Sequence, residues 1–160
     1  MSLARLERDT GPRHIIFHND PSIIYVIGEL SGRVTALHFS EGNLKPLKSF
    51  VCDNLSARGS ADIRISPDGR FLYASNRLKN DGIAIFRIEK DGGLSQIDYI
   101  NTGIHPRNIV ISPNGKYLLA SCRDSGGVQI FRRNKRTGRL SNTGKSIGID
   151  SPVCAVFVER

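Results

Sequence analysis

The sequence predicts an all-β protein that repeats one four-stranded antiparallel unit. Short apolar segments recur every 46 to 48 residues, turn motifs containing Gly and Pro separate them, and no stretch has helical periodicity beyond a turn or two. The 160 residues are 39% hydrophobic and 24% charged, which is the composition of a folded domain with a real core.

The first segment of each repeat sets the period. Arg13, Ala61, Arg107 and Val153 begin four aligned segments, at successive offsets of 48, 46 and 46 residues. Prolines precede three of the four segments and favour an extended start of a strand (Pro12, Pro106 and Pro152). The period is close to the ~40–50 residues of one β-propeller blade.

The other elements follow in the same order in each repeat. Ser66–Gly69 and Ser112–Gly115 have the Pro and Gly spacing of a type I turn. Second strands are expected at 23–28, 71–76 and 117–122, and alternating third strands at 82–86 and 127–131. Glycine turns then lead to polar fourth strands that begin at Leu44, Leu94 and Leu140. Four antiparallel strands at this period predict a β-propeller.

The chain holds about three and a half four-stranded blades. Within 11–158, blades are expected at 11–52, 60–101 and 105–149, followed by an inner or orphan strand at 152–158. A closed propeller has 4–8 blades, so either a longer protein or a second copy completes the ring. Residues 1–10 are a separate segment, either an outer strand or a remnant of cloning. Open blade faces are expected to expose Ile83, Ile85, Val128, Ile130 and Val156.

Charge and cysteine content narrow the function classes. The net charge of +8 favours an anionic partner. Much of it lies in the basic run 132–139, which is expected to be a solvated hairpin edge and has no interleaved aromatic residues to stack nucleic-acid bases. Three widely spaced cysteines predict buried free thiols and no metal site (Cys52, Cys122 and Cys154). A charged start without an apolar core, and no long apolar run, predict a cytoplasmic protein without a membrane partner.

Strand direction places a group of polar residues at one end of the blades. The first strand of a blade crosses from one face to the other and the second returns, so the start of one lies beside the end of the other. First strands begin with Arg13, His14, Asp62, Arg107 and Asn108, and second strands end at Glu29, Arg77 and Arg123. His105 precedes Pro106 at the mouth. This funnel suits an anionic small molecule; alternatively, ion pairs there only join neighbouring blades, the role expected of Asp62 and Arg123 alone.

Three segments resemble the seven-bladed lactonase family, which includes propeller-type 6-phosphogluconolactonases and fungal carboxymuconate-lactonizing enzymes. They are GPRH at 11–14, SNR at 75–77 and HPRN at 105–108, and the likeness runs from about Gly11 to Phe157. The resemblance implies a site without metal or cofactor that uses arginines, a glutamate and a histidine. Its arginine and glutamate positions fall on Arg13, Glu29 and Arg77, and the N-terminal blades of the family have no counterpart here.

The leading hypothesis is hydrolysis of an anionic sugar lactone such as 6-phosphogluconolactone. Glu29 or His14 would be the base, and Arg13 and Arg77 would hold the developing negative charge or the anionic group of the substrate. Substrate-binding residues would be Arg107, Asn108, Arg123, Asp62 and His105. The alternatives are a muconate-type cycloisomerase on the same residues and a non-catalytic interaction platform. Two copies of three and a half blades would add up to the seven of the family.

Overall fold

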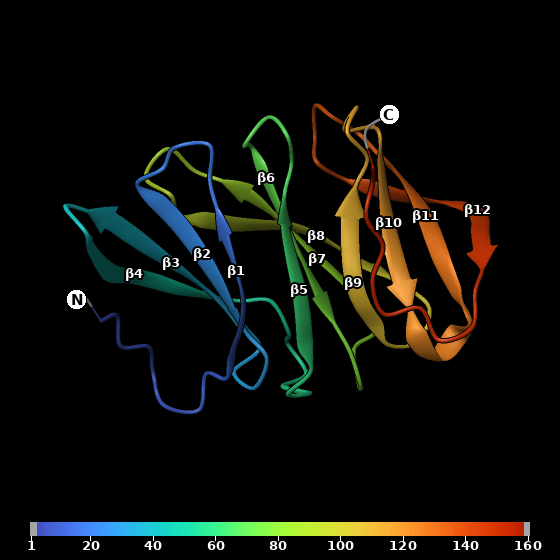
Figure 1. Cartoon of the computed structure of the whole chain (residues 1–160), viewed down its shortest axis with the longest axis horizontal. Helices are drawn as coiled ribbons and strands as arrows, with labels where there is room; N and C mark the ends of the chain where they lie inside the picture. Colours follow the sequence, from blue (N-terminus) through green and yellow to red (C-terminus); the bar gives the residue numbers. More distant parts are fainter. Residues whose placement is uncertain (1–2, 159–160) are drawn as a thin grey trace.

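The computed structural model describes residues 3–158, which form three four-stranded antiparallel sheets (Figure 1). Blade 1 contains β1 (Pro12–Phe17), β2 (Ile23–Gly28), β3 (Arg33–Ser40) and β4 (Asn43–Val51). Blade 2 contains β5 (Ser60–Ile65), β6 (Phe71–Asn76), β7 (Gly82–Ile88) and β8 (Leu94–Asn101). Blade 3 contains β9 (Pro106–Ile111), β10 (Tyr117–Cys122), β11 (Gly127–Arg133) and β12 (Leu140–Gly148).

The all-β prediction is confirmed. In each blade the strands are hydrogen-bonded in sequence order, as expected for a meander. Within residues 3–158 the only helix is η1 (Arg123–Ser125), a single 3-10 turn. No helix in this range is long and apolar enough to cross a membrane.

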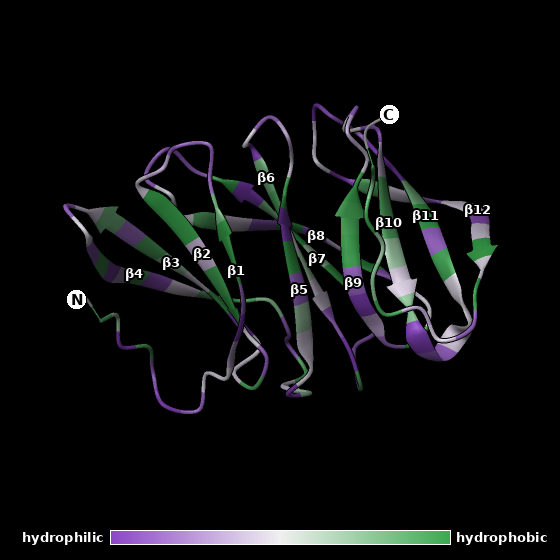
Figure 2. Ribbon diagram, in the orientation of Figure 1, coloured by the Kyte–Doolittle hydropathy of each residue, from purple (hydrophilic) through white to green (hydrophobic). Residues whose placement is uncertain are grey.

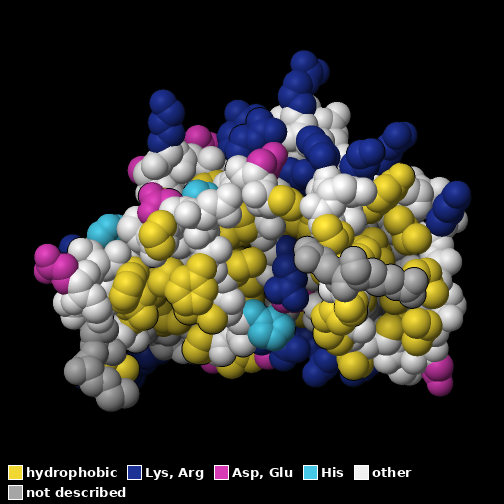
Figure 3. All heavy atoms as spheres, turned by 45° about the horizontal axis from the view of Figure 1, so that its top comes forward, with side chains coloured by type: hydrophobic (Ala, Val, Ile, Leu, Met, Phe, Trp, Pro, Cys, Tyr) yellow, Lys and Arg dark blue, Asp and Glu magenta, His cyan; other side chains and the backbone are white. Residues whose placement is uncertain are grey.

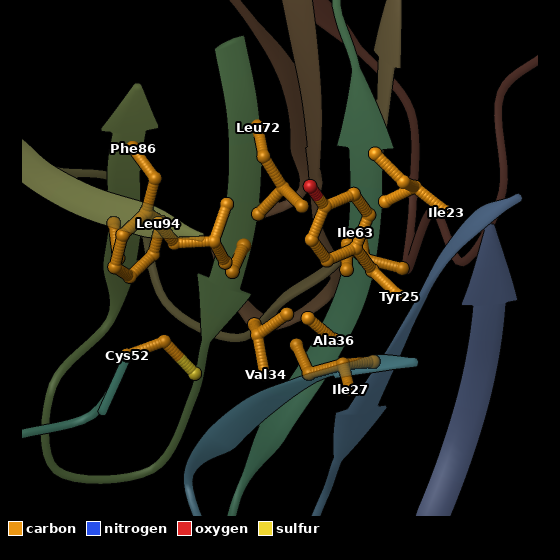
Figure 4. Packing of buried hydrophobic residues seen from close by; sticks show 12 residues of the cluster. Ile23, Tyr25, Ile27, Val34, Ala36, Cys52, Ile63, Leu72, Phe86 and Leu94 are labelled. Atoms are coloured by element: carbon orange, nitrogen blue, oxygen red, sulfur yellow. The ribbon is translucent and has the colours of Figure 1, made fainter. Parts of the chain in front are cut away.

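The blades pack face to face through two apolar layers. Along β6 the side chains alternate, so that Leu72 faces blade 1 while Tyr73 faces blade 3. Figure 4 shows Tyr25 and Ile27 of blade 1 against residues of blade 2. Because β2 and β6 are covered on both sides, all six residues of each strand are buried. The inner strands are accordingly more hydrophobic than the outer β4 and β12 (Figure 2).

The prediction that the apolar residues of blade 2 are exposed is wrong, because blade 2 lies between the other two blades. Ile83 and Ile85 are fully buried between blades 2 and 3 rather than exposed on an open flank. Val128 is also buried and Ile130 is half-buried, whereas Val156 is 75% exposed, as expected. The exposed face of a strand depends on which side the next blade stacks, and the repeat pattern alone does not give that side.

The two ends of the chain lie against the outer flanks. Residues 3–10 contain no strand, and Ala4 and Leu6 pack on the outer face of blade 1. Residues 152–158 are not assigned to a strand either, but the Ala155 N–H donates to Asn108 Oδ1 at 2.9 Å. This segment lies where the inner strand of a fourth blade would begin, and within residues 3–158 it has no sheet partner. Cys52 and Cys122 are buried free thiols, but Cys154 on this segment is exposed, contrary to expectation.

A tyrosine and a glycine join neighbouring blades in the same way twice. The Tyr25 hydroxyl donates to the Gly92 carbonyl at 2.9 Å, and the Tyr73 hydroxyl donates to the Gly138 carbonyl at 2.8 Å. Gly138 has φ of +76°, and a Cβ there would overlap the Phe71 ring. The equivalent Gly42 of blade 1 has the same φ of +76° but no atom within 4 Å of such a Cβ.

Alanine substitutions at Gly42 and Gly138 distinguish the free-energy cost of backbone strain from that of overpacking. Gly42→Ala is expected to lower the free energy of unfolding by about 1–2 kcal/mol, the cost of a left-handed alanine. Gly138→Ala carries the same strain and also overpacks the junction of blades 2 and 3, so its loss is expected to be about 1–3 kcal/mol larger. Urea unfolding of both variants measures the difference, and equal losses would show that the Gly138–Phe71 contact does not hold the blades together.

Candidate active site

The expected end of the blades does bring the first and second strands together. Register pairs place Pro12 opposite Gly28, Ser60 opposite Asn76, and Pro106 opposite Cys122. The residues next to these pairs therefore share the lower edge of the sheets in Figure 1. The antiparallel geometry of the strands creates this cluster of charged side chains.

Glu29 lies between two arginines. Its Oε2 is 3.4 Å from Arg13 Nη1, and its Oε1 accepts a short hydrogen bond from Arg77 Nη2. Burial raises the pKa of Glu29, but the Arg77 hydrogen bond and the Arg13 charge outweigh it and hold the pKa below its usual value. Backbone carbonyls fix both guanidinium groups, since Arg13 Nε donates to Ala61 at 3.0 Å and Arg77 Nε donates to Gly59 at 2.9 Å.

The arginine side of this network extends to His105. Arg77 Nη1 lies 2.9 Å from His105 Nε2, and His105 Nδ1 lies 3.1 Å from Asp124 Oδ2. Because a guanidinium only donates, Nε2 accepts and the imidazole proton lies on Nδ1, facing Asp124. Burial lowers the pKa of His105, and the positive charges of Arg123 and Arg77 lower it further. Neutral His105 thus accepts from Arg77 at one nitrogen and donates to Asp124 at the other.

A second network is centred on Asp62, which is 1% exposed. Its Oδ1 lies 3.0 Å from His14 Nδ1, and its Oδ2 accepts from Asn108 Nδ2 at 2.7 Å and from the Ile109 N–H at 3.0 Å. Arg64 Nη2 also lies 3.2 Å from Oδ2. Asp62 therefore joins blades 1 and 3 to blade 2 while it orients the imidazole of His14.

The structure separates the other predicted residues into paired and free side chains. Arg123 forms a bidentate pair with its neighbour Asp124, with Nε 2.6 Å from Oδ1, so it points along η1. Arg107 is half-buried and forms no ion pair within residues 3–158, although its charge contributes to lowering the pKa values of Arg77 and His105. The sequence reasoning missed Arg64 and Asp124. The position of Asp124, directly after the end of a second strand, was the available signal for it.

Taken together, these residues form a surface that combines arginines, carboxylates and a histidine. A carboxylate orients two fixed arginines, a buried aspartate orients His14, and Arg107 has no ion-pair partner in the described part of the chain. His14 is 43% exposed, so its ring is accessible to a bound molecule. Such a surface suits acyl chemistry in which negative charge develops on an oxygen.

Comparisons with known proteins identify the family of the chain. Residues 2–157 match the family described as lactonase, seven-bladed β-propeller. A 6-phosphogluconolactonase of Formosa agariphila is 42% identical over 151 residues, covering 91% of this chain and 43% of the relative. That of Bacillus subtilis strain 168 is 35% identical over 158 residues, covering 94% and 45%.

Solved structures give the same result. A Bacteroides fragilis protein assigned as a 6-phosphogluconolactonase superimposes with a TM-score of 0.95 at 47% identity, over 97% of this chain and 44% of that one. The periplasmic gluconolactonase of Pseudomonas aeruginosa has a TM-score of 0.90 at 28% identity, over 96% and 44%. The chain spans less than half the length of these relatives. By sequence and by structure, it belongs to the family of seven-bladed β-propeller lactonases.

Proposed function

We propose that this chain supplies the arginine, glutamate and histidine face of a lactonase that hydrolyses an anionic sugar lactone such as 6-phosphogluconolactone. The Glu29 carboxylate held between Arg13 and Arg77 is the observation that carries the proposal. The lactonases among the relatives support it, and they give no support to a muconate cycloisomerase or a non-catalytic platform.

Ester opening divides into three tasks. A base takes a proton from water as the water oxygen attacks the lactone carbonyl, donors stabilise the resulting oxyanion, and the ring oxygen leaves with a proton. Among the two candidate bases, the low pKa of Glu29 makes that carboxylate a weak one. His14 is better suited, because Asp62 holds its Nδ1–H and leaves the Nε2 lone pair for water, as in hydrolases with an aspartate–histidine pair.

The arginines take the electrostatic tasks. Arg13 is already fixed by the Ala61 carbonyl of β5 and Arg77 by the Gly59 carbonyl just before it, so they stabilise an oxyanion without reorganisation. Arg107 carries a charge that no carboxylate of residues 3–158 neutralises, and it is assigned to the phosphate or carboxylate of the substrate. Asn108 and His105 support this surface through Asp62 and Arg77 respectively. These steps use side chains and water alone.

The purified chain is expected to hydrolyse 6-phosphogluconolactone above the spontaneous rate. His14→Gln is expected to lower kcat about 100-fold or more, because general-base catalysis contributes about that factor. Arg107→Ala is expected to raise KM with kcat little changed, because it removes binding rather than chemistry. Arg139→Ala, on the distant β11–β12 hairpin, is the control. Equal kcat values for His14→Gln and the unaltered chain would exclude His14 as the base.

The low pKa of His105 predicts how stability depends on pH. A histidine whose folded pKa is depressed binds fewer protons than in the unfolded chain, so its contribution is present above the unfolded value of 6.5 and is lost as pH falls toward the folded pKa. Urea unfolding at pH 7.5 and 5.5 is expected to show lower stability at the lower pH. His105→Gln should reduce this difference, whereas His38→Gln, at an exposed position, should preserve it; the reverse pattern would contradict the assignment.

A further part of the proposal is that copies of this chain associate through their open flanks. The accessible surface is 8869 Å², against about 7,900 Å² expected for a folded monomer of 17.6 kDa. Blade 3 carries a cavity of about 600 Å³ whose lining is mixed, with Leu119, Ile130 and Phe157 among its apolar residues and Arg132 and Lys145 among its polar ones. Ile15 and Phe17 are exposed on blade 1. The alternative is that further blades of a longer chain cover these faces.

Light scattering at micromolar concentration tests association. A mass above that of one chain is expected, since apolar patches of more than a few hundred Å² are rare on monomers. A monomer with a sharp unfolding transition would mean that the open flanks are tolerated. We also propose a cytoplasmic location, which the three free thiols support because oxidising compartments favour disulfides.

A further inference from the structure

A second group of arginines lies at the opposite end of the same strands. Arg70, Arg87 and Arg136 line a cavity of about 290 Å³ together with Phe71 and Ile88, and this cavity is called the rear pocket below. Its arginines come from the β5–β6 turn, the end of β7 and the β11–β12 hairpin, so it spans blades 2 and 3. Lys and Arg side chains gather along this rim of the molecule (Figure 3).

Two of the three arginines have no carboxylate partner among the residues that the structure describes. Arg70 pairs with Asp68 at 3.0 Å, donates to the Lys135 carbonyl at 2.7 Å and stacks on the Phe71 ring. Asp68 is shared, because Arg133 Nη2 lies 3.3 Å from its other oxygen. Within residues 3–158, Arg87 and Arg136 form no ion pair, so no carboxylate in direct contact neutralises these two positive charges of the pocket.

The repeat shows that joining the blades does not require these arginines. The junction of blades 1 and 2 has the same tyrosine-to-glycine bond and the same packing, with Gly92 on Ile23 in place of Gly138 on Phe71. By strand register and turn position, the residues that correspond there to the three arginines are Ser22, His38 and Lys90. Lys90 is the one permanent cation among these three residues, yet blades 1 and 2 pack in the same way. Packing of the blades therefore does not explain the three arginines of the rear pocket.

We propose that the rear pocket binds a dianionic phosphate group. Guanidinium groups bind phosphate oxygens through paired N–H donors, and two unpaired charges match a dianion. The volume is at the lower end of the ~300–1,000 Å³ found for small-molecule sites, which suits inorganic phosphate, pyrophosphate or the phosphate end of a small metabolite. All three arginines are exposed, so a solvent anion can reach them, and Phe71 and Ile88 form the apolar part of the lining. A bound anion would connect the β11–β12 hairpin to blade 2.

Inorganic phosphate at pH 8, where it is mostly the dianion, is the probe, with titration calorimetry and the thermal unfolding midpoint as readouts. The unaltered chain is expected to bind it and to unfold at a higher temperature in its presence. Arg87→Ala/Arg136→Ala is expected to weaken binding about tenfold or more, because two charge-assisted contacts are lost. Lys45→Ala/Lys145→Ala removes the same net charge from exposed positions outside the rear pocket and is expected to bind like the unaltered chain.

Three results would overturn the proposal. No binding by the unaltered chain would exclude the site, and equal weakening by both double variants would reduce the effect to net charge. Undiminished binding by Arg87→Ala/Arg136→Ala would place the bound phosphate outside the rear pocket. If that variant does not fold by circular dichroism, Arg87→Lys/Arg136→Lys keeps the charge and removes the forked donors, and weaker binding by this variant is again expected.

Discussion

Both the fold and the candidate site depend on the hydrogen bonds that the buried Asp62 carboxylate accepts. Burying a charge is unfavourable unless donors surround it. Asp62 meets this condition with the His14 imidazole from blade 1, the Ile63 N–H of its own strand, and Asn108 and the Ile109 N–H from blade 3. A single acceptor thus fixes the relative positions of three inner strands, and the same bond orients a candidate catalytic imidazole. Loss of this carboxylate would therefore disturb blade packing and His14 together.

The same contact repeats along the chain and explains its last segment. Asn108 occupies the position of Asp62 one blade later, and its Oδ1 accepts the Ala155 N–H as Asp62 Oδ2 accepts the Ile109 N–H. The bond holds Ala155 at the place of an inner strand, although the segment 152–158 pairs with no strand within the described range 3–158. Position in a propeller is therefore set by contacts between blades near the channel, before the strand pairs of the blade itself are complete.

The sequence predicted those features that depend on local periodicity. Strand starts near Arg13, Asp62 and Asn108 follow from alternation and turn motifs, and antiparallel geometry then brings Glu29 and Arg77 to the same edge. The side on which Ile83 and Ile85 are buried depends on blade stacking, which a repeat leaves open. Arg64 lies two residues after Asp62 on the same strand and so faces the same way, but its bond to the Ile109 carbonyl depends on the stacking of blade 3 on blade 2. The contact of Asp124 with His105 depends on the single turn of η1, which the repeat pattern does not predict.

The two ends of the strands use arginine differently. At the candidate active site, backbone carbonyls and Glu29 fix Arg13 and Arg77 before any ligand arrives, so little conformational entropy is lost when an oxyanion forms. In the rear pocket only Arg70 is fixed, and Arg87 and Arg136 must be ordered by the anion they bind, at about 0.5–1.5 kcal/mol for each side chain. The first arrangement favours stabilisation of a transition state, and the second favours reversible binding that depends on salt concentration. Arginine occurs at both ends, and the groups that fix its side chain determine which of these two roles it suits.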